Sequence, residues 1–205
     1  MLRAVFFDFG GVISSSPLEG FREYERRNGI PEGFIVRVNS TNSDTNAWAR
    51  IERSDVTLDE FDELFAIESE SLGHRIPGRA MIALLRGMIR PEMVRALDIL
   101  RKHQFILGCL TNNVVNLGSS AEHEEAFAKF DFVVESSKVN VRKPERRFYE
   151  IACELADVSP EECVFLDDLG INLKTARQMG MVTIKVTSAD QALGELAELV
   201  GIELR

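Results

Sequence analysis

The sequence predicts an α/β protein in which a parallel sheet is covered by helices on both faces, with a helical subdomain inserted into the sheet domain. Three observations favour this fold: five short apolar segments typical of strands, helical patterns between most of them, and a long segment, residues 15–88, with helical patterns only. Strands that alternate with helices indicate a doubly wound sheet, because parallel neighbours need a crossover connection, usually a helix.

The expected strands are continuous apolar runs without polar alternation. Such runs are typical of strands whose two faces are both covered in a parallel sheet. In chain order they are Ala4–Phe7, Phe105–Leu110, Phe132–Val134, Cys163–Leu166 and Val182–Val186.

The helices expected between these strands show an apolar face or a boundary signal. Pro91–Lys102 has apolar residues on one face, Arg146–Leu155 follows a proline, and Asn172–Met179 ends at Gly180, a residue typical of a helix C-terminus. Asparagine is a favoured helix N-cap, so we expect Asn172 to cap the helix that it begins.

Residues 15–88 contain no convincing strand and are too long for a single crossover. Helices are expected at Leu18–Arg27, Leu58–Ser71 and Arg79–Met88, with a polar loop or cap region at Asn39–Asn46. We therefore interpret residues 15–88 as a helical subdomain, with Trp48 in its core, and residues 1–14 and 89–205 as the sheet domain.

Composition excludes several classes of function. The chain has 205 residues, 45% of them apolar, and a net charge of −9. An acidic protein is a poor match for nucleic acid, which is bound by clustered Lys and Arg. No apolar run approaches the roughly 20 residues that span a membrane, and the first apolar run is too short for a signal peptide. We expect three buried free cysteines, Cys109, Cys153 and Cys163, and a cytoplasmic location; the sequence leaves the oligomeric state open.

Polar side chains follow four of the expected strands. Ligands of open α/β sheets bind at the carboxyl ends of the strands, so we expect these side chains to converge in one crevice. They are Asp8 after the first strand, Thr111 and Asn112 after the second, Lys143 in the loop after the third, and Asp167 and Asp168 after the fourth.

These residue types favour phosphoryl transfer. A carboxylate such as Asp8 can attack phosphorus, and Asp8 with Asp168 offers the oxygen ligands that Mg²⁺ prefers. Lys143 and the metal would neutralise charge on the phosphoryl oxygens. Gly10, followed by a second glycine, would let the main chain approach the ligand closely.

Four segments, FFDFGGVI, CLTNN, KPERRFY and FLDDLGINL, resemble in order the signature motifs of the haloacid dehalogenase superfamily. The likeness is greatest to the N-terminal phosphatase domain of soluble epoxide hydrolase and to the related domain of acyl-CoA dehydrogenase fusion proteins. It spans nearly the whole chain, and WARIERSDVTLDEF resembles the cap segment of this subgroup. The resemblance implies a Rossmann-like sheet of about five strands with an α-helical cap, here residues 15–88.

The resemblance also implies a nucleophile and a metal site. Asp8 would be the nucleophile and a Mg²⁺ ligand, Gly10 would offer its backbone carbonyl to the metal, and Asp168 would complete the site, with Asp167 orienting it. The sequence departs from the common pattern at Gly10, where most phosphatases of the family have the aspartate that acts as general acid and base.

The phosphoryl group would be held by Thr111 and Asn112, and its charge stabilised by Lys143. The implied function is a Mg²⁺-dependent phosphatase of small phosphorylated metabolites. Two alternatives stay open. Gly10 also fits a metal-independent 2-haloacid dehalogenase, although the acid pair Asp167 and Asp168 does not, because clustered acids repel one another. A phosphate-binding or regulatory domain without turnover is the other.

Overall fold

The structure is a computed structural model that describes residues 1–115 and 120–205. Its centre is a five-stranded parallel sheet in the order β3-β2-β1-β4-β5. The strands are β1 (Ala4–Phe7), β2 (Ile106–Thr111), β3 (Phe132–Glu135), β4 (Cys163–Asp167) and β5 (Val182–Lys185). The predicted parallel sheet is therefore confirmed, and each expected strand lies at its predicted place to within a residue.

The register of the sheet brings the ends of the central strands together. Phe7, the last residue of β1, lies opposite Cys109 of β2 and Leu166 of β4. Asp8 consequently emerges beside the end of β4, and its backbone N–H donates to the Leu166 carbonyl at 2.8 Å.

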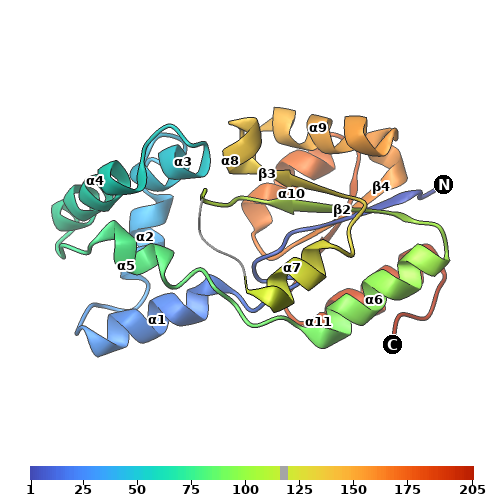
Figure 1. Ribbon diagram of the computed structural model, residues 1–205, viewed down its shortest axis with the longest axis horizontal. Coiled ribbons are helices and arrows are strands. Elements are labelled where there is room, and N and C mark those ends of the chain that lie inside the picture. Colours follow the sequence, from blue (N-terminus) through green and yellow to red (C-terminus); the bar gives the residue numbers. More distant parts are fainter. Residues whose placement is uncertain (116–119) are drawn as a thin grey trace.

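Alternate side chains of β1 point to opposite faces of the sheet, as the pleat requires. Val5 and Phe7 pack on the face covered by α6 (Pro91–Lys102) and α11 (Ala189–Val200), whereas Ala4 and Phe6 pack on the face covered by α9 and α10. These last two helices span Arg146–Ala156 and Gly170–Gln178 (Figure 1). Both faces are thus buried, which explains the continuous apolar strands. Three short elements complete this part: α7 (Ala121–Phe127), α8 (Ser136–Val139) and the 3₁₀ turn Pro160–Glu162.

Helices α1 to α5 form what we call the helical unit, beside the carboxyl ends of the strands (Figure 1). It has its own apolar core, to which Phe21, Ile35, Phe61 and Phe65 contribute. The ring of Trp48 packs against three of these phenylalanines, as expected. The helices are α1 (Pro17–Arg27), α2 (Phe34–Ser40), α3 (Ala47–Glu52), α4 (Leu58–Ser71) and α5 (Gly78–Ile82).

One boundary within the unit was predicted wrongly. The helix expected at Arg79–Met88 ends at Ile82. Met88 lies outside the helix because it pairs with the segment between β1 and α1: the Met88 carbonyl accepts a hydrogen bond from Ser15 N at 2.8 Å. The segment Asn39–Asn46, expected to be a polar loop or cap region, includes both: a polar loop follows the end of α2 at Ser40, and the Asn46 side chain caps α3 through Ala49 N at 2.9 Å.

No described helix is long and apolar enough to span a membrane. The three cysteines are buried and form no disulfide, as predicted.

Candidate functional site

The polar residues predicted at the strand ends converge on one cleft. This cleft, of about 700 Å³, lies between the sheet edge and the helical unit. Its walls include Asp8, Gly10, Thr111, Asn112, Lys143 and Asp168. Asp167 does not line the cleft and is fully buried beneath it.

Lys143 is the cationic centre of the site. Its Nζ lies 2.8 Å from Asp8 Oδ1 and 2.8 Å from Asp167 Oδ2, and only 1% of its side chain is exposed. Burial opposes the charged ammonium, but attraction to Asp167 and Asp8 outweighs it and holds the pKa of Lys143 above its usual range. The lysine therefore stays cationic at the foot of the cleft.

Asp167 uses both of its oxygens to hold the site together. Asn172 Nδ2 lies 3.1 Å from Oδ1 and 3.0 Å from Oδ2, and Leu169 N donates to Oδ1 at 2.8 Å. The expectation that Asn172 caps its helix was wrong: α10 begins at Gly170, so Asn172 lies inside the first turn and its amide turns to Asp167 instead.

We expect Asp167→Ala to lower the free energy of unfolding by about 3–5 kcal/mol, because it breaks a buried ion pair and leaves buried donors without an acceptor. Urea denaturation measures the loss. The matched control is Glu150→Ala, which removes an exposed partner of Arg146 and should cost no more than about 1 kcal/mol. Equal losses in the two variants would show that Asp167 does not hold the site together.

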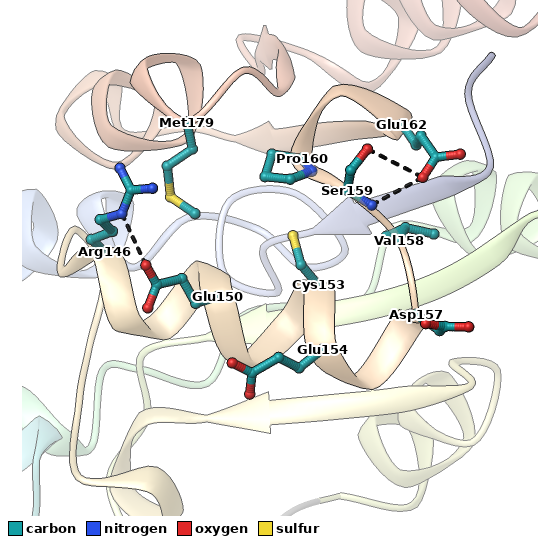
Figure 2. A pocket seen from close by; sticks show the side chains of 10 residues that line it. All are labelled: Arg146, Glu150, Cys153, Glu154, Asp157, Val158, Ser159, Pro160, Glu162 and Met179. Carbon is teal, nitrogen blue, oxygen red and sulfur yellow. Dashed lines mark hydrogen bonds and ion pairs between the residues drawn. The ribbon is translucent and has the colours of Figure 1, made fainter.

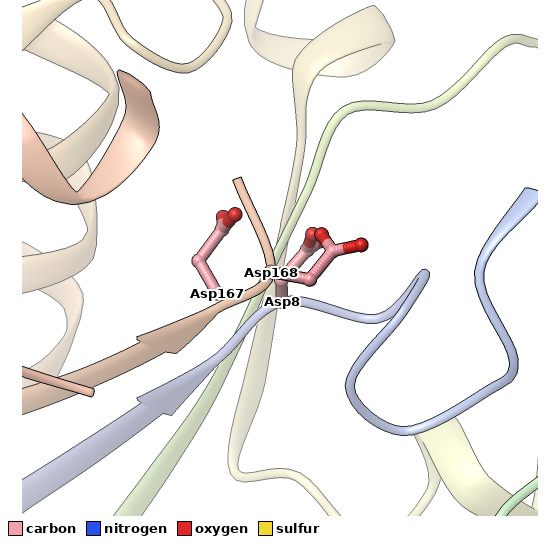
Figure 3. A group of neighbouring side chains, drawn as sticks. All are labelled: Asp8, Asp167 and Asp168. Atoms are coloured by element: carbon pink, nitrogen blue, oxygen red, sulfur yellow. The ribbon is translucent and has the colours of Figure 1, made fainter. Parts of the chain in front are cut away.

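Of the three neighbouring acids Asp8, Asp167 and Asp168, Asp8 and Asp168 face the cleft. Asp8 Oδ1 accepts from Phe9 N at 2.7 Å, and Asp168 Oδ2 accepts from Ser16 Oγ at 3.2 Å. Oxygens of Asp8, Asp167 and Asp168 lie within 4.8 Å of one another, and Figure 3 shows Asp167 projecting away from the other two.

Asp8 and Asp168 both have raised pKa values. Burial, with the charges of Asp167 and Asp168, raises the pKa of Asp8 to about 8 against the opposing effect of Lys143. Burial and then Asp167 also raise the pKa of Asp168. Crowded carboxylates of this kind are stabilised by a cation.

The residues present fit a hard divalent cation. Lys143 pairs with Asp8 and Asp167, and Asp168 takes part in neither of these ion pairs, so the cluster has more oxygen donors than its ammonium can satisfy. The main chain also presses against the site: Gly11 has φ +81°, and a Cβ there would lie 2.2 Å from Asp168 Oδ2. Only glycine permits this approach, and the neighbouring Gly10 lines the cleft together with Asp8 and Asp168.

Thr111 and Asn112 lie where the sequence predicted. Thr111 is buried at the end of β2, and its hydroxyl lies 3.4 Å from the Asn112 carbonyl. The side chain of Asn112 is bonded to the backbone of Lys143: Lys143 N donates to Oδ1 at 2.9 Å and Nδ2 donates to Lys143 O at 3.1 Å.

Three residues of the site were missed by sequence reasoning. Ser16 caps α1 and also donates to Asp168, and a serine before a proline was an available signal for the cap. Glu52 and Arg142 form an ion pair at 2.5 Å in the cleft wall, and no local pattern links residues so far apart in the chain.

A second hollow of about 430 Å³ lies along α9 (Figure 2). Its walls include Cys153 and charged side chains that pair with each other, such as Arg146 with Glu150 at 2.9 Å. It shares no residue with the cleft and contains none of the predicted site residues.

Comparison with protein families gives a match to the haloacid dehalogenase-like hydrolase model over residues 2–180. Acyl-CoA dehydrogenase family member 10 of Mus musculus is 34% identical over 98% of this chain and 19% of its own length. Bifunctional epoxide hydrolase 2 of the same organism is 31% identical over 98% of the chain and 39% of its own length. The chain thus spans less than half of these relatives.

A relative of similar length is the sesquiterpene phosphatase astK of Aspergillus oryzae, 28% identical over 97% of each chain. Among solved structures, a HAD family enzyme of Bacteroides thetaiotaomicron in complex with magnesium and inorganic phosphate has a TM-score of 0.62 at 20% identity. It covers 96% of this chain and 99% of its own. This likeness concerns the fold.

Proposed function

This chain belongs to the haloacid dehalogenase-like hydrolase family, and on that premise we propose that it is a Mg²⁺-dependent phosphatase of small phosphorylated metabolites. The observation that carries the proposal is the contact of Asp8 with the buried Lys143 at the foot of the cleft, 2.8 Å apart. A fixed nucleophile beside a fixed cation suits attack on a group that bears negative charge.

The proposed reaction has two steps. A carboxylate oxygen of Asp8 attacks phosphorus, and the bond from phosphorus to the ester oxygen breaks; the leaving oxygen keeps the electron pair and takes a proton from solvent water. Water then attacks the phosphorus of the aspartyl-phosphate, releasing inorganic phosphate and the carboxylate. Lys143 and the Thr111 hydroxyl stabilise the phosphoryl oxygens in both steps.

Asp8, Asp168 and the Gly10 carbonyl would hold Mg²⁺, and Asp167 would orient the site through Lys143 and Asn172. When bound, the metal neutralises phosphoryl charge and favours the ionised form of Asp8.

We expect Asp168→Ala to weaken Mg²⁺ binding by at least about tenfold, because a metal site loses one of its few protein oxygens. Activity should recover in part at high Mg²⁺, since the nucleophile is still present. Calorimetric titration measures the affinity, with Asp44→Ala as a control in the same cleft. Unchanged affinity in Asp168→Ala would exclude Asp168 as a ligand.

We propose that residues 15–88 act as the cap that selects the substrate. The helical unit supplies an apolar wall to the cleft, formed by Leu18, Phe21, Val36, Trp48 and Leu85. Such a wall favours phosphate esters whose organic part is apolar. The relative named as a sesquiterpene phosphatase supports this preference.

A panel of phosphate esters assayed with and without Mg²⁺ tests the function, and halide release from 2-haloacids tests the alternative that Gly10 favours. Release of phosphate only when Mg²⁺ is present supports the proposal. Halide release without metal would replace it with dehalogenation. Binding of phosphate without any turnover would indicate a non-catalytic domain.

A further inference from the structure

We propose that Glu52 and Arg53, at the end of α3, are positioning residues that fix Lys143 and Asn112 through two reciprocal ion pairs. The proposal rests on the proposed function, because Lys143 matters as the cation that meets the phosphoryl group. It assigns to the helical unit a part in aligning the reaction centre as well as in covering it.

The two ion pairs have opposite polarity and lie on either side of the lysine. Glu52 Oε2 lies 2.5 Å from Arg142 Nε, and Arg53 Nε lies 2.7 Å from Glu145 Oε1. Arg142 and Glu145 flank the segment Lys143–Pro144. Glu52 and Arg53, which are consecutive in the chain, thus form ion pairs with the residues on either side of Lys143–Pro144.

Glu52 also reaches the lysine by a second route. Its Oε2 accepts from Asn112 Nδ2 at 3.2 Å, and Asn112 holds the backbone of Lys143 on both sides. The other oxygen, Oε1, accepts from Trp48 Nε1 at 3.0 Å. Both carboxylate oxygens of Glu52 therefore accept hydrogen bonds. Through them Glu52 connects α3, the end of β2 and the segment that carries Lys143.

Burial distinguishes the pair of Glu52 and Arg142 from an ordinary surface ion pair. The side chain of Glu52 is 9% exposed and that of Arg142 is 13% exposed. Removing one partner of such a pair leaves a desolvated charge, so the surrounding groups must rearrange. Part of the rearrangement would fall on Asn112, which Glu52 contacts, and through Asn112 on the Lys143 backbone.

Neighbouring hydrogen bonds dock α3 in the same place. Ser54 Oγ donates to the Ser137 carbonyl and Asn140 Nδ2 to the Arg53 carbonyl, both at 2.9 Å. Arg142 Nη1 donates to the Ser43 carbonyl at 2.9 Å. Polar contacts of this kind have defined geometry, so the docked unit imposes one position on the lysine segment.

The test compares Glu52→Gln, Arg142→Gln and the double variant, assayed with Mg²⁺ and an aryl phosphate. We expect each single change to lower kcat/KM by about 10- to 100-fold, as for other residues that orient a reacting group. The double variant should lose no more than the worse single variant, because both changes break one interaction. Glu63→Gln, which removes an exposed partner of Arg75 in the same unit, should leave activity unchanged.

The inhibition constant of orthovanadate separates positioning from mere loss of folded protein. Vanadate resembles the transition state, so its inhibition constant should rise by the same factor as kcat/KM falls. A smaller folded fraction would lower kcat without changing that constant. An unchanged vanadate constant in folded Glu52→Gln and Arg142→Gln overturns the proposal.

If Glu52→Gln does not fold, as judged by circular dichroism, Glu145→Gln tests the more exposed pair with Arg53, and an unchanged vanadate constant there overturns the proposal. If the wild type turns over no phosphate ester, the proposed function fails. The positioning role is then read from vanadate affinity alone, by calorimetry, with the same expected loss.

Discussion

Asp8→Asn is expected to remove turnover of every phosphate ester, by on the order of 10⁴- to 10⁶-fold, the range seen when a nucleophile is deleted. The amide keeps the shape of the side chain at the end of β1 but cannot attack phosphorus. Steady-state assays with an aryl phosphate measure the loss. Activity within tenfold of the wild type would mean that another group attacks.

The same variant should keep its fold, which is the control for this experiment. Without metal, folding raises the pKa of Asp8 from 3.8 to about 8, so the folded protein retains a proton that the unfolded chain loses. Stability from this group is therefore lost as the pH rises from about 4 to about 8. Asparagine has no such charge, so metal-free Asp8→Asn should melt at or above the wild-type temperature near pH 8. A clearly lower melting temperature would trace the lost activity to misfolding.

Local patterns were sufficient to predict the sheet and most of the site. The strands are continuous apolar runs because helices cover both faces of the sheet. Asp8, Thr111 and Asp167 each end or follow such a run, so their meeting at one edge follows from parallel topology alone. Lys143 was placed by its motif, and its loop brings it to the same edge.

Elements that depend on partners distant in sequence were not predictable in this way. The short helix α8 spans only Ser136–Val139 and has no periodicity to detect. The role of Asn172 depends on Asp167, whose oxygens attract the amide away from the helix end. Glu52 reads as an ordinary charged residue, and its burial becomes evident only when α3 docks against Arg142.

The second large effect concerns Gly10, which lines the cleft two residues after the nucleophile. General acid–base catalysis typically contributes about 10²–10⁴-fold, and a glycine cannot supply it. The cost falls on alkyl phosphates, whose alkoxide leaving group needs a proton, more than on aryl phosphates, whose leaving group is a stable anion. We therefore expect wild-type kcat/KM for an aryl phosphate to exceed that for an alkyl phosphate by about 10²-fold or more.

Gly10→Asp should narrow this gap, and the structure admits a Cβ at this position. Apart from its two chain neighbours, the described residue that a Cβ at Gly10 would meet within 4 Å is Pro17, at 3.7 Å from Cδ and 4.0 Å from Cγ, which is ordinary contact. The neighbouring Gly11 tolerates no side chain, so the position of the added acid is restricted to Gly10.

Gly10→Ala is the matched control, because it adds the Cβ without the carboxyl group and should keep the wild-type preference for aryl phosphates. The measurement is kcat/KM for both esters on the three proteins. If the wild type hydrolyses alkyl phosphates as fast as aryl phosphates, another group already donates the proton. If Gly10→Ala lowers the ratio of aryl to alkyl kcat/KM as much as Gly10→Asp does, the effect comes from backbone restriction and not from an acid.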